Sequence, residues 1–274
     1  MKYILTFGLT TALGGLLALG CGCAEQAEQP FTAVILSGTA NNAAADESGW
    51  GTIKGQLVFD GDKIPERKPL DISKDQDHCL KTGPVNDEAW VVNPKNKGVR
   101  WVVVFLKQDA NKPLPVHDKL KTPPGDAVLD QPQCAFVPHV LTMRADQKLL
   151  VKNPAPVLHS ATFKGFKNDT NLTLQPGENK SFTIELEKNA ITMTCSFHPW
   201  MRGYLWVFEH PYFATTDADG NFEIKLAPTG PQRLVIWQES IGYLGGRAGR
   251  DGREIQVKSE GVTDVGAIKI KPTE

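Results

Sequence analysis

The chain has 274 residues, of which 41% are hydrophobic and 22% are charged, a composition that suits one or two globular domains. Its 30 Lys and Arg residues nearly balance its 31 Asp and Glu residues, so the net charge is −1. This balance argues against a nucleic-acid-binding protein, which normally carries a basic excess, and against wholesale disorder. Because prolines and glycines are frequent and few segments show a helical period, we expect an all-β fold.

The N-terminus has the pattern of an export signal. Residues 1–20 contain one lysine and an apolar stretch of about 16 residues, shorter than the roughly 20 residues that span a bilayer. The small residues before Cys21 resemble a bacterial lipobox, which would make Cys21 the lipidated first residue; simple secretion is the alternative. Both predict an exported protein of the periplasm or cell envelope that meets a membrane only through a lipid anchor. Residues 21–48, rich in Ala, Gln, Asn and Glu, are typical of a flexible tether.

Residues 49–125 form a predicted N-terminal β segment. Residues 51–59 have the composition of a strand and end in an Asp-Gly-Asp turn. Residues 101–106 are a near-continuous apolar run, which predicts a buried strand. The polar stretch 62–98 and the proline-rich stretch 108–125 are expected to be connections.

A denser series of strands follows. Residues 181–186 alternate strictly, so that Phe182, Ile184 and Leu186 share one face. Turn signals separate these short strands at regular spacing, which indicates β-sandwiches. The predicted strands are 149–151, 181–186, 191–195, 204–208, 221–226, 234–237, 254–257 and 267–270.

Potential metal ligands concentrate directly after one of these strands. Cys195, His198 and Met201 offer a thiolate, an imidazole and a thioether within seven residues. This mixture favours copper, because zinc, calcium and magnesium sites do not use methionine. A trigonal copper site needs a second histidine, and His159 lies 36 residues upstream after another strand. The sequence therefore predicts one copper ion held by His159, Cys195 and His198, with Met201 as a weak axial ligand. A buried thiol with an exposed imidazole is the alternative.

Residues 126–210 resemble a type 1 copper cupredoxin, with amicyanin and pseudoazurin as the nearest types. The resemblance rests on the short Cys-x-x-His-x-x-Met loop and its His-Pro-aromatic-Met-Arg-Gly run at residues 198–203. It implies a Greek-key β-sandwich around the copper. Asn153 resembles an asparagine that, in the family, joins the two ligand segments by hydrogen bonds near the thiolate. Asn153 and Ser196 are therefore expected to support the ligands from outside the copper's own coordination.

The C-terminal residues 211–274 resemble a transthyretin-like module of carboxypeptidase regulatory domains. The likeness lies in the Asp-Ala-Asp-Gly turn, the alternating strand after it and the apolar run 234–237. Such modules open with a strand like residues 51–58 and continue with one like 101–106. We therefore expect the cupredoxin to be inserted into a discontinuous transthyretin-like, Ig-like sandwich. The alternative is an N-terminal extension, a cupredoxin and a separate C-terminal domain.

Two further cysteines, Cys79 and Cys134, are expected to form a disulfide, because cysteines normally pair in an oxidising compartment. The alternative is a second metal site that they would build with His78 and His139.

Three residues of the ligand loop are candidates for contact with a partner. Phe197, Pro199 and Trp200 flank His198. Beside a histidine whose ring edge faces the surface, they would form an apolar docking surface. Their alternative place is the protein core.

The predicted function is transfer of single electrons between redox protein partners outside the cytoplasm, with His198 as the exit route. The alternative is a copper-binding or scaffold protein without redox turnover. No enzyme activity and no catalytic residue are expected. Multicopper oxidases carry His-x-His pairs, and none of the six histidines is so spaced.

Overall fold

The computed structural model describes residues 49–272. The predicted signal peptide, the tether and the lipidation candidate Cys21 lie outside these residues. Within the described part, no helix has the length and apolar character needed to cross a bilayer.

The regular secondary structure of the described residues is almost entirely β, as predicted. One four-residue α-helix and two short 3-10 helices interrupt sixteen strands. In chain order the elements are β1 Trp50–Phe59, α1 Gln76–Cys79, β2 Val103–Leu106, η1 Asp118–Leu120, β3 Ala127–Leu129, β4 Val140–Arg144, β5 Lys148–Lys152, β6 His159–Lys164, β7 Asp169–Leu174, β8 Asn179–Thr183, β9 Ile191–Thr194, β10 Arg202–Phe208, β11 Phe213–Thr215, β12 Asn221–Pro228, β13 Gly230–Gln238, β14 Gly242–Tyr243, η2 Ala248–Asp251, β15 Arg253–Val257 and β16 Val262–Ile270.

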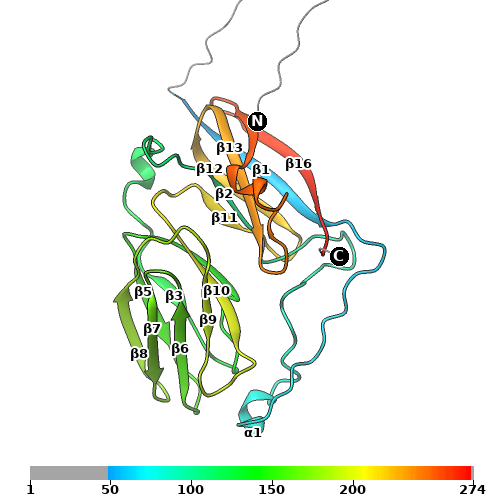
Figure 1. Ribbon diagram of the computed structural model, residues 1–274, viewed down its shortest axis with the longest axis vertical. Coiled ribbons are helices and arrows are strands. Elements are labelled where there is room, and N and C mark those ends of the chain that lie inside the picture. The colour runs from blue at the N-terminus through cyan, green and yellow to red at the C-terminus, as the bar shows by residue number, and fades with distance from the viewer. Residues whose placement is uncertain (1–48, 273–274) are drawn as a thin grey trace, which may run out of the picture. The chain divides into compact units, whose positions relative to one another are not determined.

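One sandwich, here called the terminal sandwich, combines strands from both ends of the described chain (Figure 1). Its first sheet has the order β12-β1-β16, and its second has the order β11-β2-β13-β14, with β15 added to β13. Ile53 thus lies opposite Ile224, and Phe105 lies opposite Val235. A core that includes Ile53 and Leu57, both fully buried, fills the space between the sheets. Strands β1 and β2 near the start of the described chain and strands β11 to β16 near its end therefore form one sandwich together.

The second sandwich, here called the inserted sandwich, consists of β3 to β10. Its sheets have the orders β4-β10-β9-β6-β7 and β3-β5-β8. In strand β5 the alternation of residues places one face toward the core, since Leu149 and Val151 are fully buried while Lys148 is exposed. The parallel pairs β4–β10 and β3–β5 join strands that are distant in sequence.

Strand β10 has apolar residues on both faces because it faces two cores. Leu205 and Val207 belong to the core of the inserted sandwich. Trp206 and Phe208 belong to a separate cluster that also contains Val103 and Trp237 of the terminal sandwich. The ring centroids of Trp206 and Trp237 lie 5.5 Å apart. The unbroken apolar run in this strand thus reflects burial on both sides.

The structure differs from the sequence prediction at several segments. The stretch expected as a plain connection, residues 62–98, contains α1 and a bridge between Pro69 and Asn86. Strands β6 and β7 were not predicted. Strand β7 is mostly polar and exposed and has only a weak apolar pattern. Strand β8 ends at Thr183, although Ile184 continues the alternation and is buried.

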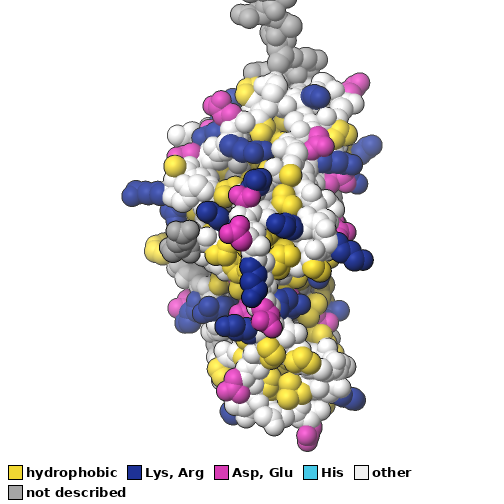
Figure 2. Space-filling view, turned by 90° about the vertical axis from the view of Figure 1, so that its right-hand side faces the viewer, with side chains coloured by type: hydrophobic (Ala, Val, Ile, Leu, Met, Phe, Trp, Pro, Cys, Tyr) yellow, Lys and Arg dark blue, Asp and Glu magenta, His cyan; other side chains and the backbone are white. Residues whose placement is uncertain are grey.

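Charges of both signs are interspersed on the surface. Figure 2 shows Lys and Arg side chains scattered among Asp and Glu side chains, with hydrophobic side chains between them. No broad single-sign patch appears on the face in view, in agreement with the near-zero net charge.

Candidate metal centre

The register of three strands brings the predicted ligand segments together. Strand β6 begins at His159 and pairs with β9, so that Thr162 lies opposite Thr194. Strand β9 in turn pairs with β10, with Thr194 opposite Arg202. The loop 195–201 between these paired ends is therefore closed at its base, with Cys195 at its start.

Two imidazole nitrogens converge on the sulfur of Cys195. The Sγ atom lies 3.9 Å from Nδ1 of His159 and 3.7 Å from Nδ1 of His198. A metal with bonds of roughly 2.0 Å to nitrogen and 2.3 Å to sulfur, about 120° apart, holds such atoms about 3.7 Å from each other. All three side chains are buried. The spacing of the donor atoms therefore fits a metal ion in trigonal coordination.

The protonation state of His159 suits a ligand. Burial, followed by the neighbouring charge of His198, lowers the pKa of His159 from 6.5 to about 4. The imidazole is therefore neutral near neutral pH, and a ring nitrogen keeps a lone pair for a metal.

Met201 closes the ligand loop. Its side chain is buried in the same core as Cys195, and its backbone N–H donates to the carbonyl of His198 at 3.0 Å. This turn places Met201 beside the ligand segment, and its role as the axial ligand stays a prediction.

Ser160 is a site residue that sequence reasoning missed. Its backbone N–H donates to the Cys195 sulfur at 3.3 Å, and its hydroxyl lies 3.8 Å from the same atom. The hydroxyl also accepts the N–H of Ser196 at 2.8 Å. Ser160 therefore joins the two ligand segments. Its position next to His159 was the only sequence signal for this role.

Asn153 has a different set of partners from the one expected. Its amide donates to the carbonyls of Val157 at 2.9 Å and Leu174 at 3.0 Å. Within residues 49–272 it makes no hydrogen bond to Cys195, because it holds the loop before His159 against the end of β7. The Ser196 hydroxyl has partners other than the sulfur, namely the Thr162 hydroxyl at 3.3 Å and the Asn171 amide at 3.2 Å.

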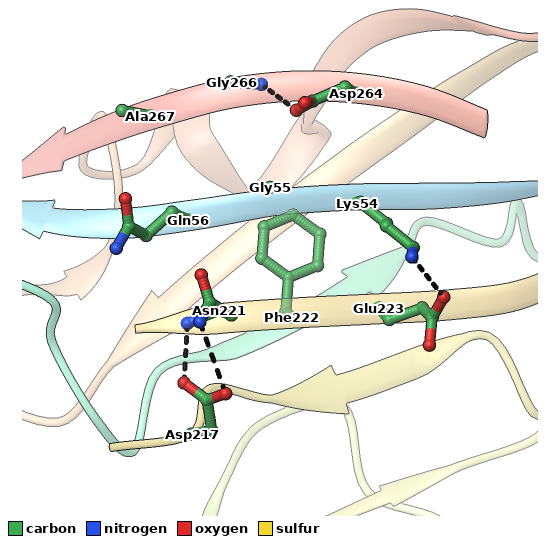
Figure 3. A pocket seen from close by; sticks show the side chains of 10 residues that line it. All are labelled: Lys54, Gly55, Gln56, Asp217, Asn221, Phe222, Glu223, Asp264, Gly266 and Ala267. Atoms are coloured by element: carbon green, nitrogen blue, oxygen red, sulfur yellow. Dashed lines mark hydrogen bonds and ion pairs between the residues drawn. The ribbon is translucent and has the colours of Figure 1, made fainter. Parts of the chain in front are cut away.

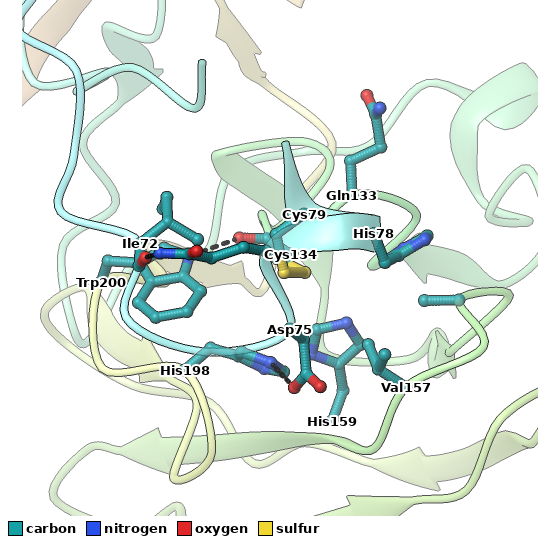
Figure 4. The surroundings of a disulfide bond; sticks show 12 residues. Ile72, Asp75, His78, Cys79, Gln133, Cys134, Val157, His159, His198 and Trp200 are labelled. Carbon is teal, nitrogen blue, oxygen red and sulfur yellow. Dashed lines mark hydrogen bonds and ion pairs between the residues drawn. A yellow bond between two sulfur atoms is a disulfide. The ribbon is translucent and has the colours of Figure 1, made fainter. Parts of the chain in front are cut away.

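The structure contradicts the expected surface position of His198. Its side chain is 0% exposed, and its Nε2 lies 2.8 Å from Oδ2 of Asp75. Asp75 belongs to a segment here called the cap, residues 69–86, whose ends pair through the Leu70 N–H and the Val85 carbonyl at 2.8 Å. Figure 4 shows the Asp75 carboxylate directed at the His198 ring, with the disulfide nearby. The prediction failed because the covering residues lie outside the resembling region.

A disulfide holds the cap on the inserted sandwich. Cys79 and Cys134 are bonded, with Cα atoms 5.3 Å apart. The histidines of the alternative second metal site have other partners. His78 Nε2 lies 3.1 Å from the Pro132 carbonyl, and His139 Nε2 lies 2.7 Å from a Glu239 carboxylate oxygen.

The three predicted docking residues do not form one exposed patch around His198. The Trp200 indole N–H donates to the Cys134 carbonyl at 3.1 Å, and its ring lies 5.0 Å from that of His198. Phe197 is half-buried against the core, and only Pro199 is exposed. Trp200 is thus a contact between the ligand loop and the disulfide-linked segments.

A separate polar pocket of about 640 Å³ lies on the terminal sandwich (Figure 3). Its charged side chains are paired locally. Lys54 meets Glu223 at 3.0 Å, and Asp217 accepts the backbone N–H of Asn221 at 2.8 Å. These contacts are those of ordinary strand and turn residues, and they assign the pocket no ligand.

Comparison with known proteins gives similarity to solved structures only. No family model matches the chain, and no curated protein matches it. An oxidized P94A mutant of amicyanin shares 20% identity over 32% of this chain and 86% of that chain, with a TM-score of 0.28. A purple cupredoxin from Nitrosopumilus maritimus shares 22% over 30% of this chain and 99% of that chain, with a TM-score of 0.27. A copper-containing nitrite reductase from Thermus scotoductus shares 18% over 35% of this chain and 25% of that chain, with a TM-score of 0.28. Because these TM-scores are low, the functional conclusion depends on the site geometry.

Proposed function

We propose that the chain is an extracytoplasmic electron carrier with one type 1 copper ion per molecule. His159, Cys195 and His198 would hold the metal, with Met201 as a weak axial donor. The observation that carries this proposal is the convergence of two imidazole nitrogens on the Cys195 sulfur at 3.7 and 3.9 Å. When bound, copper supplies a one-electron couple between Cu(I) and Cu(II).

The chain's own residues would keep the site rigid. His159 begins a strand, and Cys195 directly follows a neighbouring strand of the same sheet. The Ser160 N–H donates to the sulfur and stabilises its thiolate form, which tunes the potential. Full burial of both histidines excludes water from the donor atoms. A site whose ligands move little between oxidation states is suited to electron transfer rather than to turnover of a substrate.

The remaining predictions belong to the same proposal. Residues 1–20 would export the chain to the periplasm or cell envelope, and Cys21 would carry a lipid anchor. A disulfide is typical of such an oxidising compartment. The terminal sandwich would be the transthyretin-like module, and the partners would be redox proteins rather than nucleic acids.

One observation favours a second candidate function. The His198 side chain is fully buried, with Asp75 of the cap at its Nε2, whereas a carrier that exchanges electrons through direct contact benefits from an exposed ligand. Copper binding without redox turnover is therefore the alternative, with the terminal sandwich as a scaffold or partner-binding module.

Copper titration of the purified mature protein tests the proposal. We expect one equivalent of Cu(II) to produce an intense blue band and the narrow hyperfine splitting of type 1 copper in EPR. The band should bleach on reduction with ascorbate and return on oxidation. A colourless Cu(II) complex would overturn the type 1 assignment. A blue protein that cannot be cycled would favour the alternative.

A further inference from the structure

The cap gives His198 a carboxylate partner on the side of the ring away from the predicted metal. Nδ1 of His198 points to the Cys195 sulfur at 3.7 Å, and Nε2 meets Oδ2 of Asp75 at 2.8 Å. The imidazole thus has one nitrogen toward the donor set and the other toward an acid. The Asp75 side chain is 43% exposed, so its carboxylate also meets solvent.

Asp75 is held in place by the residues around it. It adopts a left-handed conformation with φ 48° directly before α1, a conformation that is uncommon for residues other than glycine. The Asp75 carbonyl accepts the N–H groups of His78 at 3.0 Å and Cys79 at 2.9 Å. Because Cys79 is disulfide-bonded to Cys134, the carboxylate is anchored four residues from a covalent link.

The His198 ring is enclosed on its other sides as well. The ring of His159 lies 4.5 Å away and that of Trp200 lies 5.0 Å away, measured between centroids. The Trp200 indole is itself tied to the Cys134 carbonyl. The same disulfide therefore positions both the acid and an aromatic neighbour of this ligand.

We infer that Asp75 is a positioning residue for the copper site, which rests on the proposed function. Its carboxylate accepts the Nε2–H of His198, which fixes the tautomer with the lone pair on Nδ1 and orients the ring toward the metal. A carboxylate behind a ligating histidine also makes the imidazole a stronger donor. Asp75 belongs to the polar stretch that precedes the inserted sandwich in the chain. A residue from outside this sandwich therefore influences His198, a predicted ligand within it.

The sign of the effect on the reduction potential follows from charge. An anion near the metal stabilises Cu(II) more than Cu(I), so Asp75 lowers the reduction potential. Loss of an outer-shell partner typically weakens metal binding by roughly 10- to 100-fold. Because Asp75 is partly exposed and solvent screens its charge, we expect a loss of Cu(II) affinity near tenfold for its removal. A tenfold loss confined to Cu(II) raises the potential by about 59 mV for one electron.

The variant Asp75→Asn tests this role with little change in shape. Its side-chain oxygen can still accept the Nε2–H, so the ring and the blue band should persist, and voltammetry should show a higher potential. The matched control is Asp77→Asn, which removes the same charge from an exposed residue of α1. We expect the control to shift the potential much less.

A second measurement needs no copper. In the metal-free protein, ¹⁵N NMR of the histidine rings should show His198 protonated at Nε2 and bare at Nδ1. In Asp75→Ala, which has no acceptor, we expect a mixture of the two tautomers.

The outcomes separate this inference from the proposed function. An Asp75→Asn protein with the wild-type potential, or one shifted no more than Asp77→Asn, would overturn the role of Asp75 while the copper site stood. An unchanged tautomer in Asp75→Ala would do the same. A wild-type protein without the blue band would instead remove the proposed function.

Discussion

Removal of the Cys79–Cys134 disulfide should cost the protein a large part of its stability. The bond closes a loop of 55 residues. In the chain-entropy model a loop of this length stabilises the folded state by about 4 kcal/mol at 25 °C. For a folded part of this size each kcal/mol corresponds to roughly 2–4 °C, so the melting temperature should fall by about 8–16 °C.

The perturbation is the double variant Cys79→Ala/Cys134→Ala. Both side chains are buried in the core of the inserted sandwich, so alanine avoids burying an unpaired hydroxyl. Thermal unfolding is followed by circular dichroism on the metal-free protein, because bound copper would add its own stabilisation. The control is Cys195→Ala, which removes the free buried thiol and leaves the disulfide intact.

The copper spectrum separates two consequences of the same change. The donor atoms lie in the β6 strand and the 195–201 loop, so the blue band should survive in the double variant. The potential should rise, as in Asp75→Asn, because the cap loses its anchor. A melting temperature within a degree or two of wild type would show that the entropy argument fails here.

Three further results are expected. Cys195→Ser should abolish the intense colour, since the charge-transfer band comes from the thiolate, and a serine variant that stayed intensely blue would contradict the assignment. Met201→Leu should still bind copper through three ligands but show a higher potential, because a thioether that favours Cu(II) is lost; an unchanged potential in voltammetry would remove Met201 from the axial position. Burial lowers the pKa of His210 from 6.5 to about 4. As the pH falls, this histidine therefore takes up its proton in the unfolded state before it does so in the folded state. The free energy of unfolding should accordingly decrease between about pH 6.5 and pH 4. Urea unfolding of the metal-free protein should show this loss, and His210→Asn, whose side-chain oxygen can accept the Tyr212 N–H now bonded to Nδ1, should lessen it; an equal loss in the variant would mean that other groups are responsible.

Local spacing singles out Cys195 and His198 as candidate ligands, and the structure brings both close to His159, which lies 36 residues upstream of Cys195. Cys195 and His198 lie on one closed loop, and His159 lies on a strand of the same sheet as β9. Such positions carry a recognisable pattern because the donor atoms and the strands that present them are close in sequence. The strands with strong alternation or apolar runs, such as β5 and β12, were recognisable for the same reason.

The cap was not predictable in this way. Asp75 is 123 residues from His198 and lies in a polar stretch without periodicity. Its contact depends on a disulfide and on the fold of the inserted sandwich. Ser160 was missed because its contribution comes from a backbone N–H and a buried hydroxyl, and neither is distinctive in a sequence. Asn153 was assigned its partners by resemblance, and its amide instead donates to three backbone carbonyls in the segments before β6 and at the end of β7.

Strand β10 limits how the part with the proposed copper site can be separated from the rest. Trp206 and Phe208 are buried against side chains of the terminal sandwich, with Phe105 and Phe208 5.0 Å apart. A fragment cut to residues 126–210 would expose both aromatic side chains on a single strand, a surface that favours self-association. The fragment would also lack Asp75 and Cys79, which would leave Cys134 as an unpaired thiol. Residues 126–210 are therefore a dependent part of a larger folded unit.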